Sequence, residues 1–171
     1  MVLGGTIAYE IANQLKNRGE LILGVYIIDT KAIDPAVWEK IEVLKTPNNF
    51  RKNLKVLGIS DAEIPQLLKL NSIEEKLLLT YTLPKSKDIA IILMQALKFE
   101  TSSDKEVDQL NKKIDQLTRR PNNGWDAYVK NVTVYKFDAT HYSIMKEKHL
   151  KRIVSIIEKD MNNKIKSFKN N

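Results

Sequence analysis

Three places along the sequence carry residue types that could act together in catalysis. Gly4 and Gly5 predict a turn that feeds a helix-like segment, Asp29 closes an apolar run, and His141 is expected in a loop after a later apolar run. A histidine can take a proton from a serine hydroxyl, while a carboxylate beside it fixes the imidazole tautomer and stabilises the imidazolium. This chain order predicts a turn–acid–base arrangement, with Asp29 as the acid and His141 as the base.

The apolar pattern predicts the elements that must bring these residues together. Nearly continuous or alternating apolar runs predict three strands, at Leu21–Ile28, Ile89–Met94 and Asn131–Phe137. Apolar residues at helical spacing predict helices over Gly5–Arg18, Ser103–Leu117 and Lys148–Met161, the last followed by a frayed basic tail. Strands that alternate with helices indicate an α/β fold with a parallel sheet of about three strands. Asp29 and His141 would then meet past the carboxyl ends of the strands.

A helical insertion is expected between the first two strands. Residues 33–83 contain no comparable strand and read as four short helices, which begin near Pro35, Phe50, Asp61 and Ile73. Pro65 is a possible kink in the third helix, and Ser72 is a candidate cap for the fourth. The chain is therefore expected to form one domain, 1–171, with 33–83 inserted into it.

The amino-acid composition limits the classes of protein to which this chain could belong. A chain of 171 residues, 43% apolar and 29% charged, is typical of a soluble globular domain, and the cytoplasm is the expected location. The absence of cysteine excludes disulfides and thiolate sites, and two histidines make a histidine-rich metal site unexpected. The net charge of +7 raises the possibility of nucleic-acid binding. Only five of the 28 basic residues are arginines, however, and they do not alternate with aromatic residues, so we expect neither a nucleic acid nor a membrane as partner.

The motifs in this order resemble the C-terminal two-thirds of the thioesterase domains that terminate nonribosomal peptide and polyketide synthases, which are α/β-hydrolases. In that family a G-x-S-x-G-G turn enters a helix of small residues, and here Gly4, Gly5 and "IAYEIANQL" match. The segment "YIIDT", which contains Asp29, is similar to the end of the family's next strand. Trp125, "VTVYKF" and "ATHYSIM" follow the family's layout around its histidine. The resemblance covers essentially the whole chain.

The resemblance implies a partial α/β-hydrolase fold that lacks the N-terminal strands, with residues 33–83 as the family's helical lid. It implies a Ser-His-Asp mechanism in which His141 is the general base and Asp29 its orienting acid. The implied substrate is an acyl or peptidyl chain on the phosphopantetheine thiol of a carrier protein, which is the expected partner. No cofactor or metal is expected to be held by this chain.

Two departures from the family pattern concern the nucleophile. Alignment of the glycines places Val2 at the position of the serine, and valine has no nucleophilic atom. The family's upstream strands and one oxyanion-hole donor are absent from the sequence, and the backbone N–H of Leu3 would be the other donor. We therefore expect this chain to lack turnover by itself, through natural loss or a truncated reading frame. Ala139 also replaces the family's usual glycine two residues before the histidine.

Alternatives remain for each role. Asp29 could merely end a strand, and His141 could be a solvent-exposed loop histidine. Asp104 and Asp138 are alternative acids, because many α/β-hydrolases carry theirs after a later strand. Thr140 and Ser143 carry hydroxyls but lie too close to His141 in sequence to replace the serine convincingly. His149, at a helix start, reads as solvated or capping.

A second function remains open besides catalysis. The chain could be a non-catalytic remnant or interaction module that associates, with itself or with an upstream fragment, through an exposed sheet edge. A third reading, a basic nucleic-acid binder, would require binding that weakens steeply with salt.

Overall fold

The computed structural model describes residues 3–32, 34–44, 47–56 and 58–169. Contacts between residues divide the chain into two compact units. The first unit contains Met1–Lys31, Pro84–Lys98 and Pro121–Asn171, and the second contains Ala32–Leu83 and Phe99–Arg120. No helix among the described residues combines the length and the apolar character that a bilayer crossing requires.

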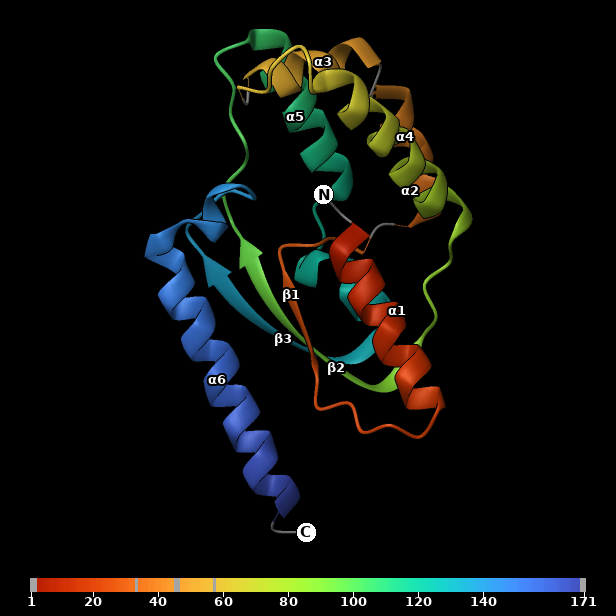
Figure 1. Ribbon diagram of the computed structural model, residues 1–171, viewed down its shortest axis with the longest axis vertical. Coiled ribbons are helices and arrows are strands. Elements are labelled where there is room, and N and C mark those ends of the chain that lie inside the picture. The colour runs from red at the N-terminus through yellow and green to blue at the C-terminus, as the bar shows by residue number, and fades with distance from the viewer. Residues whose placement is uncertain (1–2, 33, 45–46, 57, 170–171) are drawn as a thin grey trace. The chain divides into compact units, whose positions relative to one another are not determined.

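The first unit is built on a parallel sheet of three strands, as the sequence predicts (Figure 1). The strands are β1 (Val25–Ile28), β2 (Ser86–Ala96) and β3 (Val129–Phe137), in the order β1-β2-β3. Ile91 at the middle of β2 stands opposite Val25 on one side and Val132 on the other. β1 is shorter than the predicted Leu21–Ile28, since it begins only after Gly24, a residue type that weakens strands.

Helices cover both faces of this sheet. α1 (Leu3–Asn17) and the short helix η1 (Pro121–Ala127) lie on one face, and α6 (Glu147–Lys169) lies on the other (Figure 1). Ile92 and Met94 of β2 pack with Phe137 and with Ile153 of α6. Ile91 and Leu93 alternate with them and are fully buried towards α1. The middle of β2 is therefore buried on both faces, as its continuous apolar run predicts.

Gly5 allows α1 to approach the end of β1 closely. A Cβ atom on Gly5 would lie 2.6 Å from Cβ of Thr30, which is shorter than any real contact of this kind. A Cβ atom on Gly4 would meet nothing within 4 Å. The prediction that Gly4 and Gly5 form a turn before the helix is wrong, since both lie in the first turn of α1. Of the two, only Gly5 packs closely against another residue.

A polar cluster fastens α6 to the edge strand β1. The Tyr26 hydroxyl donates a hydrogen bond of 2.7 Å to Oδ2 of Asp160, and Nζ of Lys164 pairs with the same oxygen at 2.7 Å. Burial and the hydrogen bond to Asp160 raise the pKa of Tyr26 well above its usual range. Burial works to raise the pKa of Asp160, but hydrogen bonds from Lys164 and Tyr26 lower it overall. The cluster thus favours a neutral tyrosine beside a charged carboxylate.

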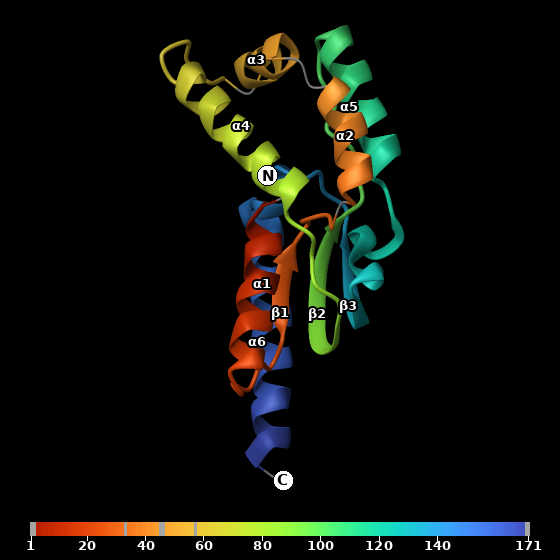
Figure 2. The ribbon, with the colours of Figure 1, turned by 90° about the vertical axis from the view of Figure 1, so that its right-hand side faces the viewer.

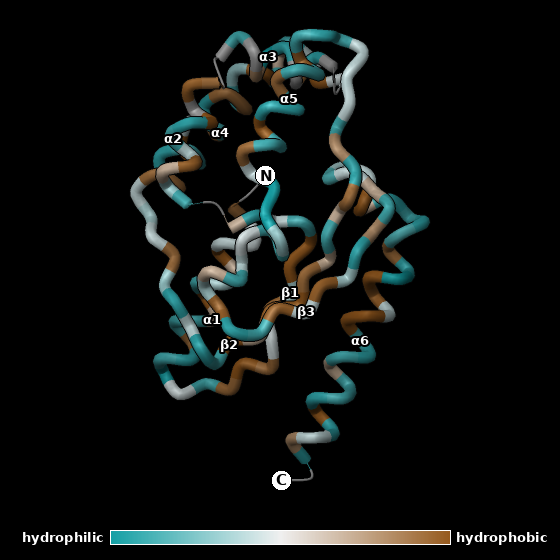
Figure 3. Tube along the Cα trace, turned by 180° about the vertical axis from the view of Figure 1, so that it is seen from behind, coloured by the Kyte–Doolittle hydropathy of each residue, from teal (hydrophilic) through white to brown (hydrophobic). Residues whose placement is uncertain are grey.

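α6 is longer than the sequence predicts. The expected helix ends near Met161 with a frayed tail after it, but the observed helix continues to Lys169. Apolar residues continue at helical spacing beyond Met161, at Ile165 and Phe168, and they recur along α6 to its C-terminal end in Figure 3. This spacing indicates that the helix continues, although the many basic residues of the tail suggested a frayed end.

Among its described residues, the second unit contains helices and connecting loops but no strand. They are α2 (Pro35–Leu44), α3 (Pro47–Val56), α4 (Ile64–Thr80) and α5 (Lys105–Thr118). Lys52 of α3 pairs with Glu106 of α5, and Trp38, Ile41 and Val107 are buried. α5 therefore completes the compact unit that contains residues 33–83.

One helix replaces two of those expected in the second unit. α4 runs without interruption where the sequence suggested one helix from Asp61 and another from Ile73. Pro65 lies in the first turn of α4, where its missing N–H costs no intrahelical hydrogen bond, so it does not kink the helix. Ser72 consequently lies inside α4 and is not a cap.

Replacing Gly5 with alanine is expected to destabilise the chain by about 1–3 kcal/mol, because the new Cβ forces α1 away from Thr30. Gly4→Ala is the matched control, and it should be neutral or stabilise by up to about 1 kcal/mol through helix propensity. Urea unfolding monitored by circular dichroism measures both. Equal effects of the two substitutions would contradict the close approach at Gly5.

Tyr26→Phe is expected to lower the free energy of unfolding by about 1.5 kcal/mol at pH 7, since Asp160 loses a donor. Because the folded-state pKa of Tyr26 lies above its unfolded value of about 10, this stabilisation is present below pH 10 and is lost as the pH rises further. Urea unfolding at pH 7 and at about pH 10.5 tests the difference between the two chains. Tyr135→Phe, a half-buried tyrosine of the same sheet, is the control.

A candidate histidine–carboxylate site

Asp29 directly follows β1 and is held in an uncommon backbone conformation. Its φ is +50°, in the left-handed region that aspartate tolerates better than most residues. Its backbone N–H still donates to the carbonyl of Met94 on β2, at 2.8 Å, as a continuing strand would. The side chain is 93% buried, so its carboxylate requires partners within the protein.

His141 is placed by a compact turn after β3. The backbone N–H of Thr140 donates to Oγ of Ser143 at 2.7 Å, and the N–H of Ser143 donates to Oγ1 of Thr140 at 3.2 Å. These reciprocal bonds lead into the short helix η2 (Ser143–Met145). The two hydroxyls also lie 3.1 Å apart, so both serve the turn that holds the histidine.

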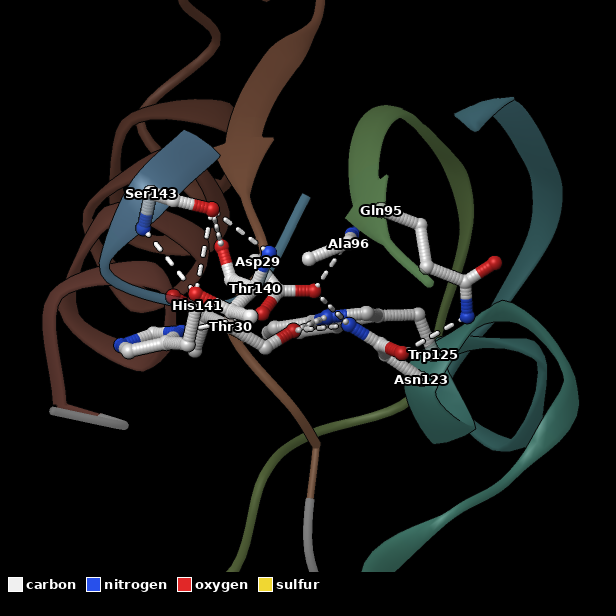
Figure 4. Close-up of polar contacts among 9 residues, drawn as sticks. All are labelled: Asp29, Thr30, Gln95, Ala96, Asn123, Trp125, Thr140, His141 and Ser143. Carbon is white, nitrogen blue, oxygen red and sulfur yellow. Dashed lines mark hydrogen bonds and ion pairs between the residues drawn. The ribbon is translucent and has the colours of Figure 1, made fainter. Parts of the chain in front are cut away.

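The two residues meet at hydrogen-bond distance. Nδ1 of His141 lies 2.9 Å from Oδ2 of Asp29 (Figure 4). An ionised carboxylate only accepts hydrogen bonds, so Nδ1 carries the proton in this contact and Nε2 is the basic nitrogen of the ring. The histidine side chain is 34% exposed while the carboxylate is buried, so the base reaches the surface and the acid does not.

The other carboxylate oxygen is occupied from the opposite side. Oδ1 of Asp29 accepts from the backbone N–H of Ala96 at 2.9 Å and from Nδ2 of Asn123 at 3.3 Å. Asn123 is itself fixed, because Nε2 of Gln95 donates to its Oδ1 at 2.8 Å. The contacts to Oδ1 restrict rotation of the carboxylate and leave Oδ2 directed at His141 (Figure 4).

η1 supports the site through side chains that the sequence analysis did not assign to it. Asn123 is buried with φ +51°, and Nε1 of the fully buried Trp125 donates to the carbonyl of Thr30 at 2.8 Å. The sequence "NNG" is a signal for left-handed backbone and could have marked this turn. The contribution of Ala96 is a backbone N–H, which no side-chain pattern reveals.

The alternative acids lie elsewhere. Asp104 caps α5 in the second unit, where its side chain accepts from the backbone N–H groups of Glu106 and Val107. Asp138 is exposed and pairs with Nζ of Lys98 at 2.8 Å. Of the three candidate acids, the structure brings Asp29 to His141.

The remaining sequence expectations have mixed outcomes. His149, which the sequence analysis expects to be solvated or capping, is half-buried and packs edge-on against Phe137, with ring centroids 5.9 Å apart. Ala139 is buried and has no left-handed φ, so alanine fits where the resembling family usually has glycine. Leu3 is the first residue of α1, and the expectation for Val2 lies outside the described residues. Among the described residues no group of three potential metal ligands occurs.

Comparisons with known proteins identify the family and the fold of this chain. The family named "Thioesterase domain" matches residues 2–161. The Vlm2 thioesterase domain, solved with 2,3-diaminopropionic acid and bound with a dodecadepsipeptide, is 21% identical with a TM-score of 0.58. The NocB thioesterase domain, solved as a covalent complex with a fluorophosphonate nocardicin G analog, is 16% identical with a TM-score of 0.60. Identities this low establish likeness of fold.

The alignments cover different shares of this chain and of the solved domains. The alignments cover 92% of this chain but only 65% of the Vlm2 domain and 61% of the NocB domain. The 171 residues therefore span less than two-thirds of either solved domain. No match was found among curated proteins.

Asp29→Asn is expected to reverse the tautomer of His141. An amide can offer its NH₂ group to Nδ1, and the ring proton then moves to Nε2. Long-range ¹⁵N–¹H correlation spectra report the protonated nitrogen directly. The exposed Asp138→Asn is the control and should leave the Nδ1–H form unchanged; an Nε2–H tautomer in the unmodified chain would contradict the assigned contact.

Proposed function

The chain belongs to the thioesterase domain family, and we propose that Asp29 and His141 are the acid and base of a thioester-cleaving site. The contact of 2.9 Å between Nδ1 of His141 and the buried Asp29 carboxylate is the observation that carries this proposal. Burial strengthens the interaction between the carboxylate and a protonated imidazole, so the pair is suited to hold a proton during acyl transfer.

In the proposed reaction, Nε2 of His141 accepts the proton of an attacking hydroxyl while the oxygen bonds to the thioester carbonyl carbon. The resulting tetrahedral intermediate expels the thiolate, which takes the proton from His141 and leaves as a thiol. Water, activated by the same nitrogen, then hydrolyses the acyl-oxygen ester. Asp29 holds the ring in position and stabilises its charged form at both stages.

The proposed substrate is an acyl or peptidyl chain carried as a thioester on the phosphopantetheine arm of a carrier protein. The sequence resemblance to thioesterase domains of nonribosomal peptide and polyketide synthases supports this choice. The printed descriptions of two domains of similar fold also support it, since they name a dodecadepsipeptide for Vlm2 and a nocardicin G analog for NocB. Hydrolysis and cyclisation are both compatible with an acyl-oxygen intermediate.

The nucleophile is the part of this proposal that the 171 residues do not supply. We place it at position 2, where the sequence has Val2 one residue before α1 begins at Leu3. Without a hydroxyl or thiol at that position no acyl-enzyme can form there. We therefore propose that this chain contributes the acid and base of the site but has no turnover by itself.

Incubation of the purified chain with an acyl-pantetheine thioester is expected to release thiol no faster than the His141→Ala variant does. A thiol-reactive dye measures the release. The physical reason is the valine at the position proposed for the nucleophile, since His141 would then have only water to activate. Turnover that disappears in His141→Ala would contradict the assignment of the nucleophile to position 2.

A variant with a serine at position 2 tests the role of His141 as the base. Val2→Ser should react with a fluorophosphonate about 10²-fold or more faster than Val2→Ser/His141→Ala, because general-base activation contributes about that factor. Val2→Ser/His149→Ala is the matched control and should react as Val2→Ser does. Equal labelling with and without His141 would refute the base role while leaving the fold unaffected.

A further inference from the structure

More than half of the net charge of the chain lies on one helix. α6 has seven basic and three acidic side chains, so it contributes +4 to the net charge of +7. Five of the basic residues are exposed lysines, and they recur from the first turn of the helix to the last: Lys148, Lys151, Lys159, Lys166 and Lys169. Their common position on the helix makes them a candidate binding surface.

The five lysines lie on the side of α6 that is turned away from the sheet. Ile153 is 2% exposed and packs with residues of β2 and β3, so it marks the side of α6 that faces the sheet. At about 3.6 residues per turn, all five lysines lie within roughly 60° of the direction opposite Ile153. We call this surface the lysine face. Figure 2 shows α6 alongside the sheet, with its C-terminal turns extending past the strands.

Ion pairs do not neutralise the lysine face within the part of the chain that the structure describes. None of the five lysines pairs with a carboxylate of the described residues. Lys164, on the inner side of α6, does form such a pair, with Asp160 at 2.7 Å. Glu147 and Glu158 lie at one edge of the face. The outer side of α6 therefore presents positive charge to an external anion.

Helix stability does not account for these positions. Lys148 is the second residue of α6, where the partial positive charge of the helix N-terminus disfavours a cation. Lys151 lies three residues further on, and like charges at this spacing repel. Lys166 and Lys169 suit the dipole at the C-terminal end but repeat the same like-charge spacing. An anionic partner would relieve this repulsion.

The lysine face has the length and the spacing of a contact between helices. Lys148 and Lys169 are 21 residues apart, which places the ends of the face about 32 Å apart along the axis. Lys159 and Lys166 are separated by seven residues, or about 10.5 Å. A second α-helix laid alongside presents its own side chains at steps of three, four and seven residues, as flanking charges do in paired helices. Acidic residues at those steps would face the lysines in register.

We propose that the lysine face of α6 binds an acidic α-helix of a partner protein, with the two helices side by side. The partner helix carries Asp or Glu at these steps on one side, so that each carboxylate meets a lysine ammonium group. Such pairs speed association and select the partner by charge, while lysine, a flexible point charge, tolerates small differences in register. The proposal does not rest on the thioesterase roles, because none of the five lysines belongs to the Asp29–His141 pair.

Two other anionic surfaces fit the lysine face less well. Recognition of base edges in nucleic acid relies on the forked side chain of arginine or on amides, whereas the face consists of lysines. A helix that lies on an anionic membrane turns its apolar residues towards the lipid. The outermost residues of α6 are lysines, and the exposed Val154 and Met161 lie to one side of them.

Two synthetic helices of equal charge test the geometry of this surface. The probe is an alanine-rich peptide of about 25 residues with its glutamates on one side, at the steps described above. The control peptide has the same composition, but its glutamates are spread around the helix. In about 50 mM salt, fluorescence anisotropy should show the one-sided peptide binding the full chain about tenfold more tightly, since only that peptide opposes several lysines at once.

A pair of substitutions locates the binding. Lys159→Gln/Lys166→Gln should weaken the affinity for the one-sided peptide about tenfold, because two of the opposing charges are lost. Lys69→Gln/Lys76→Gln is the matched control, since both lysines are exposed, lie seven residues apart on α4 and change the net charge equally. The control chain should bind as the unmodified chain does. All four positions are exposed, so circular dichroism should show unchanged folding.

Three results would overturn the proposal. Equal affinity for the one-sided and the control peptide would reduce the effect to net charge alone. Affinity that is the same in Lys159→Gln/Lys166→Gln and in the control chain would place the binding elsewhere. Tighter binding to a duplex DNA oligonucleotide or to phosphatidylserine vesicles than to the one-sided peptide, lost in Lys159→Gln/Lys166→Gln, would identify a nucleic acid or a membrane as the occupant.

Discussion

The burial of one carboxylate organises the first unit. A charged group removed from water must find donors inside the protein, and Asp29 finds them on three other segments: Ala96 at the end of β2, Asn123 in η1, and His141 after β3. Each donor comes from an element that the sheet already brings to the carboxyl end of β1. The same contacts that satisfy the charge therefore also fix the geometry of the candidate site.

The sequence reveals the parts of this arrangement that depend on side-chain type. Apolar runs predict the three strands, since a strand buried on both faces has a distinctive composition, and the alternation of strands with helices predicts their parallel direction. The order of glycine turn, aspartate and histidine identified the two residues that the structure brings to 2.9 Å, although they are 112 positions apart.

The features that the sequence did not reveal depend on contacts between residues far apart in the chain, or on where a helix begins and ends. Asn123 acquires its importance only because Gln95 and Asp29 flank it, and neither is close to it in the chain. Pro65 reads as a possible kink because the sequence does not show where α4 begins, and the same proline is well tolerated in a first turn. α5 also packs with the inserted helices despite the strand between them, which no local pattern shows.

The discontinuity of the first unit has a consequence for synthesis. Its three segments are separated by those of the second unit, so β1 emerges from the ribosome long before β2 can pair with it. Contacts between residues this distant in sequence form slowly, because the entropy cost of closing a long loop comes before the contacts can stabilise the fold. During that interval the apolar β1 segment and the helix before it are exposed to wrong partners. The first unit can therefore complete its sheet only after its last segment, which contains β3, has been translated.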